Sequence, residues 1–254
     1  MDRFDATLNN VSLSQLDPAV VLIDIDERAA TLERETARRS IHPGTRISAL
    51  VRRSLSVTLR FAVRAYDIDY RAHVLDMIAQ WAGRGGWLRI NSRPGQRLRV
   101  TVDEMPSVGS SLRWTDELTM TLTAYERPYW EQEYPVRAII TDSGSLRPRG
   151  TYPTAYVECE ITNAGNGTLT EAVVRCAETS IKLTGVAVPA GEKLCIAYTD
   201  KDVMTITAAG TSALANRTAE SHDDLVAATL TDNDISVTAD QPVSAVFSAR
   251  GRYW

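Results

Sequence analysis

The chain holds few of the residues from which metal sites and disulfide frameworks are built. Of its 254 residues, three are Cys and three are His. The Cys residues are odd in number, and their spacings of 17 and 19 residues match no zinc or redox motif, so we expect reduced, buried thiols. The His residues are too scattered to share a metal ion. We therefore expect neither a metal nor a cofactor.

Long apolar runs are also missing. No stretch approaches the ~18 apolar residues that a membrane-spanning helix needs, so we expect no membrane insertion. The start, Met1 to Asp5, has no basic segment followed by an apolar one, so no secretory signal is expected. The net charge of -4 gives no general reason to expect nucleic-acid recognition.

Lys is absent from residues 1–135, which contain eighteen Arg and eighteen acidic residues. Arg without Lys suits interfaces, because a planar guanidinium is weakly hydrated and pairs with carboxylates through two hydrogen bonds. High-GC codon usage would produce the same bias, and the sequence leaves both explanations open. The acidic excess lies in residues 136–254, which hold all three Lys.

The stretch from Arg60 to Trp130 contains four of the five Trp residues but no Cys, no Lys and a single His. Residues 55–64 alternate strictly between apolar and polar, which predicts a half-buried strand. Asp67 or Asp69 can then cap a helix that Gly83 ends. Strands are expected at 87–90, 98–102 and 118–125, with a turn at 93–96. This part reads as strands with one helix against them.

The chain after residue 153 predicts no helix. Short strands recur about every ten residues, separated by turn sequences such as 163–167, 189–192 and 232–234. This rhythm predicts an antiparallel β-sandwich. We therefore expect a mainly β chain with a small α+β part. Residues 1–134 would form an N-terminal domain, 135–149 a linker rich in Pro and Gly, and 150–254 the C-terminal sandwich.

Candidate catalytic patterns are weak, and we expect no enzyme. Ser221, His222 and Asp223 are triad residue types, but adjacent residues cannot form the line of proton transfer that a triad assembles across a fold. Glu158 and Glu160 would share one strand face, whereas a glycosidase needs carboxylates on either side of its sugar. A hydrolase would therefore need an acid pair or triad assembled across the fold.

A carbohydrate-binding adhesin module that contacts the host cell surface is the alternative from the binding class. Tyr129, Trp130, Tyr134 and Tyr152, near the expected junction, could stack on sugars, but aromatic side chains at a junction more often pack the junction or a partner. Residues 154–252 contain only Tyr156 and Tyr198 as Tyr or Trp, which argues against an aromatic platform on the sandwich.

The motifs of the chain resemble those of the distal tail protein (Dit) family of long-tailed bacteriophages. The resemblance starts near residue 45 and covers most of the chain. It rests on the order and spacing of several segments, which are the strand 56–61, the helix end 78–81, the turn 93–96, the sequence Ala-Tyr-Glu-Arg-Pro-Tyr-Trp at 124–130, the Gly-Thr-Tyr-Pro-Thr sequence at 150–154, and the final strands 225–238 and 249–253.

This resemblance implies a structural virion protein at the distal end of the phage tail, synthesised in the cytoplasm of the host bacterium. Such proteins form a hexameric ring through their N-terminal domains, and a galectin-like or carbohydrate-module-like sandwich projects outward. The partners implied are further copies of the chain, the tail-tube protein, and the tail hub or fibre protein. The subunits of a ring meet head to tail, and such interfaces are rich in Arg and aromatic residues. We therefore select Arg, Trp and Tyr residues of the first half as interface residues. The selected subunit-interface residues are Arg52, Arg60, Arg64, Trp81, Trp114, Tyr129 and Trp130.

Overall fold

The computed structural model describes residues 5–28, 32–38, 45–52, 54–106 and 116–254. They form a mainly β structure, as the sequence predicted, and divide into two compact units. The first unit comprises residues 1–130 together with Trp254, and the second comprises residues 131–253. Within the described ranges, no helix is both long and apolar enough to cross a bilayer.

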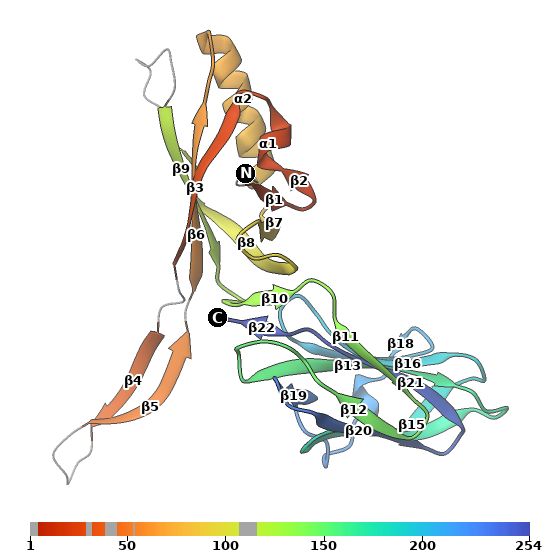
Figure 1. The fold of residues 1–254 in the computed structure, drawn as a ribbon. Coiled ribbons are helices and arrows are strands. Elements are labelled where there is room, and N and C mark those ends of the chain that lie inside the picture. The colour runs from red at the N-terminus through yellow and green to blue at the C-terminus, as the bar shows by residue number, and fades with distance from the viewer. Residues whose placement is uncertain (1–4, 29–31, 39–44, 53, 107–115) are drawn as a thin grey trace. The chain divides into compact units, whose positions relative to one another are not determined.

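The first unit is built on an antiparallel sheet whose strands run in the order β2-β1-β7-β8-β9-β6-β3 (Figure 1). Strict alternation in β6 directs Leu55, Val57, Leu59, Phe61 and Val63 to one face, where all five are buried. The strand bounds are β1 Ala6–Leu8, β2 Val11–Ser12, β3 Val20–Arg28, β6 Leu55–Val63, β7 Gly86–Ile90, β8 Gln96–Glu104 and β9 Asp116–Ala124.

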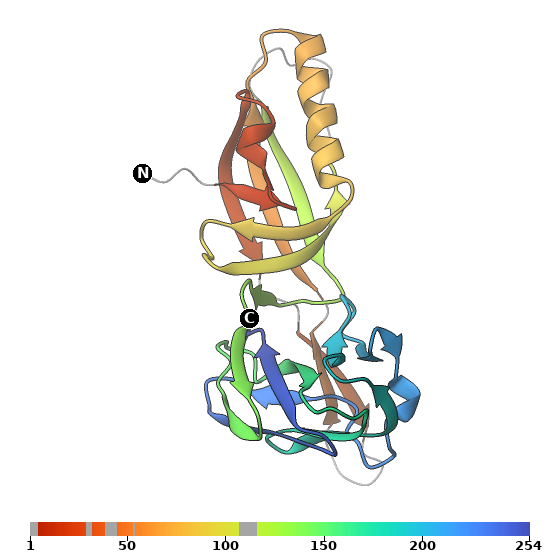
Figure 2. The same ribbon diagram turned by 90° about the vertical axis from the view of Figure 1, so that its right-hand side faces the viewer.

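Helix α2, Ile68–Ala82, runs alongside this sheet (Figure 2). Its N-cap is Asp67, whose carboxylate accepts a hydrogen bond from the Tyr70 amide at 2.6 Å. Val74 and Ile78 are fully buried on its inner face. The predicted helix is therefore confirmed, with Asp67 as its cap. The sequence did not predict the four-residue helix α1, Leu13–Leu16, since one turn has no measurable period.

A separate hairpin, β4 (Leu32–Arg38) with β5 (Thr45–Arg52), was also not predicted. In the described part of the chain, its two strands pair only with each other. The Ile-His-Pro-Gly-Thr sequence at 41–45 is typical of a turn, and it lies outside the described residues apart from Thr45 at the start of β5. An isolated two-stranded hairpin is marginally stable in water, so this one needs a further contact to stay ordered.

The second unit contains two antiparallel sheets around one core (Figure 1). The larger runs β11-β21-β13-β16-β17-β18, with β19 also on β13, and the smaller runs β12-β20-β14-β15. Both contribute to the core, for example Val157 and Phe247 from the first and Val174 and Ile181 from the second. The predicted antiparallel strands after residue 153 are therefore present. Within this unit, the only helical turn described is the 3-10 turn η1, Leu214–Asn216.

The strand bounds of this unit are β10 Trp130–Gln132, β11 Val136–Ile140, β12 Ser143–Leu146, β13 Thr154–Asn163, β14 Leu169–Cys176, β15 Thr179–Val188, β16 Lys193–Tyr198, β17 Met204–Ala208, β18 Thr211–Ser212, β19 Val226–Ala228, β20 Asn233–Ala239, β21 Val243–Ala249 and β22 Arg252–Tyr253. The last two strands, β21 and β22, are separated by Arg250 and Gly251. At the break, a Cβ on Gly251 would lie 1.7 Å from the Arg149 carbonyl oxygen, so only Gly fits there.

The stretch 135–149, expected as a linker, instead supplies one strand to each sheet of the second unit. Strand β11 pairs with β21, and β12 pairs with β20. The Pro and Gly residues that suggested a connection flank or interrupt these strands, while Val136, Ala138 and Ile140 alternate as a short strand does. The compact units divide between residues 130 and 131.

Candidate assembly surfaces

The face of the first sheet opposite its buried side is polar and carries charges in register. Asp24 on β3 lies across from Arg60 on β6, and their side chains form an ion pair. Arg60 lies in turn across from Thr119 on β9. Ser56 and Thr123, paired across β6 and β9, join their hydroxyl groups at 3.1 Å. This hydroxyl-rich face is a surface for polar contacts, since it offers few apolar side chains.

The ion pair between Asp24 and Arg60 shifts the pKa of each side chain. The hydrogen bond from the Arg60 guanidinium, helped by the backbone amide of Ile25, holds the pKa of the Asp24 carboxyl below its ordinary value. The same hydrogen bond raises the pKa of Arg60. Both side chains are more than two-fifths exposed, so water and salt screen the pair.

The predicted interface arginines have different surroundings. Arg60 is exposed but its guanidinium is already paired with Asp24 of the same chain. Arg64 is exposed beyond the end of β6, and its amide donates to the Ala19 carbonyl at 2.9 Å. Arg52 ends β5, and its side chain lies outside the described residues. Whether any of them meets a neighbouring subunit stays a prediction.

The predicted interface aromatics are mostly engaged within the chain. Trp81 is half-buried on α2, and its indole N–H donates to the Val11 carbonyl at 2.8 Å. Tyr129 is 6% exposed and Trp130 is fully buried, so neither has much surface to offer another subunit. Trp114 lies outside the described residues. A subunit contact through these residues also stays a prediction.

Part of the Arg and Trp excess is explained by stacking inside the first unit. The Arg97 guanidinium carbon lies 3.8 Å from the centre of the Trp87 ring, and that of Arg93 lies 5.1 Å from the centre of Trp130. Arg93 also forms an ion pair with Glu27 of β3. Such cation–π contacts use the aromatic face and the planar guanidinium together. Composition alone could not separate these internal pairs from subunit contacts.

An exposed aromatic pair precedes and opens α2, and the sequence analysis did not select it. Tyr66 and Tyr70 stack with their ring centres 4.9 Å apart and a 7° angle between the rings. Tyr66 is 78% exposed and the neighbouring Ile68 is 61% exposed. Tyr70 donates its hydroxyl to Asp17 at 2.5 Å, which raises its pKa to about 12. The i, i+4 spacing of the two Tyr was the signal that could have identified this pair.

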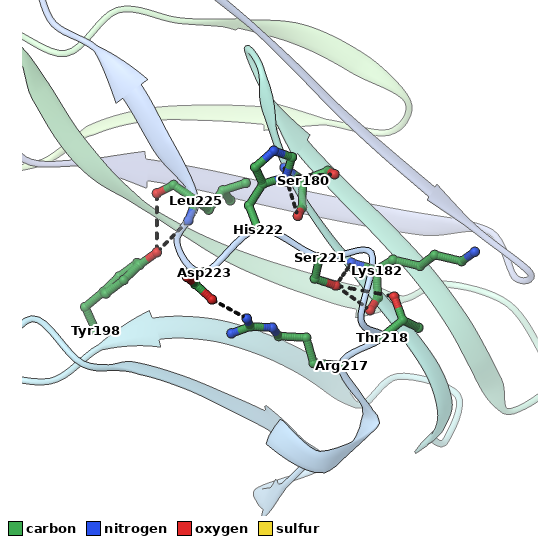
Figure 3. Close-up of polar contacts among 9 residues, drawn as sticks. All are labelled: Ser180, Lys182, Tyr198, Arg217, Thr218, Ser221, His222, Asp223 and Leu225. Atoms are coloured by element: carbon green, nitrogen blue, oxygen red, sulfur yellow. Dashed lines mark hydrogen bonds and ion pairs between the residues drawn. The ribbon is translucent and has the colours of Figure 1, made fainter.

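The segment with triad residue types binds backbone instead of forming a proton relay (Figure 3). The Ser221 hydroxyl donates to the Lys182 carbonyl at 3.1 Å and accepts from the Lys182 amide at 2.9 Å. His222 Nδ1 accepts from the Ser180 amide at 3.1 Å. Asp223 pairs with Arg217 at 2.8 Å. These side chains hold the loop 217–225 against β15.

Glu158 and Glu160 lie on the same face of β13, as the sequence predicted. Glu160 pairs with Lys193 at 2.8 Å, and the Ser248 hydroxyl donates to Glu158 at 3.4 Å. The half-buried Cys195 is directly across from Glu160, and burial raises the pKa of its thiol. Each carboxylate therefore has a neutralising or hydrogen-bonding neighbour on its own sheet face.

The aromatics of the second unit form an internal cluster. Tyr156 and Tyr198 stack with ring centres 4.4 Å apart. The Arg252 guanidinium carbon lies 4.1 Å from the centre of Tyr156 and its nitrogen lies 3.4 Å from the Asp202 carboxylate. Tyr152 lies at the edge of this cluster, 5.9 Å from Arg252. Among the aromatics suggested for sugar stacking, Tyr134 is the one that is largely exposed, at 72%.

Comparison with known proteins finds similarity at the level of the fold. No protein-family model matches the chain, and no curated protein matches it. Among solved structures, it is similar to the Dit protein (gp 19.1) of phage SPP1, described as a paradigm of hub adsorption apparatus in phages that infect Gram-positive bacteria. The two share 10% sequence identity with a TM-score of 0.75, over 98% of this chain and 99% of that one.

Two structures of the phage P2 baseplate in its activated conformation, with Ca and with Sr, are also similar. Each shares 7% identity over 98% of this chain and 97% of the other, with TM-scores of 0.54 and 0.51. The chain therefore has a Dit-like fold along nearly its whole length. The resemblance found in the sequence is confirmed at the level of the fold.

Proposed function

We propose that this chain is a structural protein of a phage tail tip or baseplate. In this role it forms a hexameric ring that connects the tail tube to the tail hub or fibre proteins. The observation that carries the proposal is the fold match to the SPP1 Dit protein, which spans both units of the chain and nearly all of the other protein. A match over one unit alone would support only a shared domain.

The first unit has the features that a closed ring requires. A ring of identical subunits joins two different surfaces of each copy, head to tail. The sheet of the first unit ends at β2 on one side and at β3 on the other, and no strand of the described residues pairs with the outer side of either. The nine-residue β3 offers the longer edge. Two unlike open edges support head-to-tail strand pairing between copies.

Two further features of this unit support assembly. The β4–β5 hairpin pairs only with itself, although two strands alone are marginally stable. Tyr66 and Ile68 expose apolar surface at the start of α2. An adjacent copy that contacted the hairpin would stabilise it, and one that contacted Tyr66 and Ile68 would bury their apolar surface. Both features therefore support assembly over a monomer.

The second unit supports a connecting role better than a sugar-binding one. Tyr198 stacks on Tyr156 and Arg252 also lies over the Tyr156 ring, so the best-stacked ring of the cluster is already covered and Tyr198 has one face occupied. A glycan array probed with the full chain tests the alternative directly. Strong selective binding to one glycan class would make the carbohydrate-binding adhesin the better assignment.

Mass photometry and negative-stain microscopy of the purified full chain test the ring. We expect a species near six times the 28.0 kDa chain mass, with a central opening in the images. A variant that replaces residues 32–52 with a short Gly-Ser linker should lower the assembled fraction. A strictly monomeric protein at micromolar concentration, and also in virions, would contradict the proposal.

A further inference from the structure

The second unit closes one side of its smaller sheet and leaves the opposite side open. The closed side is β15, whose outward backbone groups at Ser180, Lys182 and Thr184 are met by residues 216–222 (Figure 3). Thr218 donates to the Lys182 carbonyl at 3.0 Å, and His222 donates to the Ser180 carbonyl at 2.9 Å. The Ser221 hydroxyl accepts from the Lys182 amide. This loop occupies the place of a further strand, which is how proteins protect an edge from pairing.

The opposite side is formed by β11 and β12, the terminal strands of the larger and smaller sheets. The hydrogen-bond register tells which β11 groups face outward. Val157 donates to the Leu225 carbonyl, so its amide points away from β21, and alternation directs Ser248 and Val246 toward β13. Their neighbours on β21 must then face β11.

It follows that Val136, Ala138 and Ile140 bond to β21, while Arg137 and Ile139 direct their N–H and C=O groups outward. The same reasoning applies to β12. Val237 donates to the Asp142 carbonyl at 2.9 Å, which leaves the backbone groups of the alternate residues Ser143 and Ser145 facing outward. Neither β11 nor β12 has a second strand partner among the described residues.

At its centre, the open edge carries an apolar residue where a charge, a Pro or a covering loop usually protects an edge from pairing. Ile139 is 76% exposed on β11, between outward-facing backbone groups. Natural edges are usually protected by charge, by Pro or by a covering loop, and β15 has such a loop. An exposed Ile on an uncovered edge is instead typical of a surface that a further strand covers.

A pocket continues from the start of β11. It has a volume of about 720 Å³ and is lined by residues that include Val136, Pro148, Leu230 and Tyr253. Leu230 is 59% exposed and has a φ of 63°, a conformation that is costly for a bulky side chain. Its amide donates to the Pro148 carbonyl at 2.9 Å, which holds it there. The strained backbone at Leu230 thus holds an apolar side chain at this pocket.

The charged side chains that line this pocket are both positive. Arg147 and Arg149 line the pocket, and Arg137 lies on the open strand. Within the described residues, neither Arg137 nor Arg149 has an ion-pair partner. Arg147 lies 3.9 Å from Asp232, with both side chains more than half exposed, so this pair is weak. A segment that carries carboxylates would complement this side.

We propose that the open β11 edge binds an extended, acidic segment of a partner protein. The segment adds to the larger sheet as a further strand and bonds to the backbone of Arg137 and Ile139. It places an apolar side chain in the pocket beside Leu230 and Tyr253, and its carboxylates pair with Arg137 and Arg149. This inference concerns the second unit alone and does not depend on a ring.

The test uses the full chain and a labelled peptide in which Glu and Val alternate, blocked at both ends. Fluorescence anisotropy should show saturable binding. A peptide of the same sequence, N-methylated at every residue so that neither of its edges can pair, should bind on the order of tenfold more weakly or worse, because it cannot donate the strand hydrogen bonds. A peptide with Lys in place of Glu should bind no better than the N-methylated one.

Ile139→Pro is the matching protein variant. It removes an outward N–H and leaves the bonds to β21 in place, so the sheet should remain folded, as circular dichroism will check. It should weaken peptide binding on the order of tenfold, whereas Ile139→Thr, which keeps the backbone donor, should weaken it less. If the Pro variant does not fold, the N-methylated peptide still tests whether binding depends on strand hydrogen bonds.

Three outcomes would overturn the proposal. The first is the absence of saturable binding at millimolar peptide, and the second is equal binding of the N-methylated or Lys-containing peptide. The third is a change in the oligomeric mass of the peptide-free protein on Ile139→Pro, which would mean that a second copy occupies the edge. Loss of the ring in unrelated variants would leave peptide binding unchanged, so this test and that of the proposed function fail separately.

Discussion

The hydroxyl group of Tyr198 is bonded twice to the backbone of Leu225. It accepts from the Leu225 amide at 2.8 Å and donates to the Leu225 carbonyl at 3.3 Å (Figure 3). The hydroxyl thereby provides the acceptor for the amide of a fully buried residue, whose carbonyl also accepts from the Val157 amide at 2.9 Å. Burial of the phenol raises its pKa above the ordinary value. The loop 217–225 ends at this contact.

Tyr198→Phe should therefore destabilise the second unit. The variant keeps the ring that stacks on Tyr156 but leaves the buried Leu225 amide without its acceptor, at a cost of about 1–3 kcal/mol, while the carbonyl keeps its bond from the Val157 amide. Urea unfolding measures the change. Tyr134→Phe is the matched control, because Tyr134 is 72% exposed and its hydroxyl has no partner among the described residues. Equal stability of the two variants would contradict the assigned role of the Tyr198 hydroxyl.

A second buried polar group, Asn233, organises the turn before β20. Its amide nitrogen donates to the carbonyl groups of Ala228, Thr231 and Leu146 at 2.8, 2.9 and 3.1 Å, and its oxygen accepts from the Ala228 amide at 2.8 Å. The residue is 4% exposed. Water cannot easily replace these bonds, since the groups are enclosed.

Asn233→Ala should destabilise the chain by about 3 kcal/mol, because several buried backbone groups lose their partner at once. Asn233→Asp should also destabilise, because a carboxylate cannot donate to the three carbonyl groups. Chemical unfolding checks both. Asn166→Ala, at an exposed turn position of the same unit, should change the free energy of unfolding little. If Asn233→Ala lowered the free energy of unfolding no more than Asn166→Ala does, this account would be refuted.

Much of this architecture follows from local sequence signals. Period-two alternation identified β6, and Asp67 followed by apolar residues at helical spacing identified α2, because both elements bury one regular face. The Asn-rich turn at 163–167 was also recognised as a break between strands. Where a residue's role is set by its own neighbours in sequence, the sequence was sufficient.

Other features depend on pairing between distant segments and could not be predicted. The sequence predicted a linker where β11 and β12 lie, because Pro135, Gly144 and Pro148 interrupt residues 135–149 and the partners that stabilise these strands lie about a hundred residues later. Trp130 was selected for a subunit interface, yet Arg93 stacks on it within the chain. Burial and partner identity are tertiary properties, so residue type alone left them open.

The Asp24–Arg60 pair predicts a specific pH response. Because the pKa of Asp24 is lowered in the folded chain, the pair stabilises the fold above the ordinary Asp pKa of about 3.9. That contribution is lost as the pH falls through the lowered value. Carbon-13 NMR of the Asp24 carboxyl should show a midpoint below the ordinary one. Arg60→Met should return the midpoint toward the ordinary value, and Arg64→Met, the exposed control, should leave it in place.

The edge of β3 gives the sharpest test of ring assembly through the first unit. Arg64 donates to Ala19, and the paired residues Asp24, Asp26 and Arg28 bond to β6, so alternation leaves Ile25 with its backbone facing away from the sheet. Ile25→Pro removes this outward donor, which within the single chain bonds to the Asp24 carboxylate at 2.9 Å, and retains the β3–β6 bonds. We expect a folded protein that has lost the ring in mass photometry, with Ile25→Val as the control that keeps it. An intact ring in the Pro variant would mean that the copies meet through other surfaces, such as the Tyr66 and Ile68 pair.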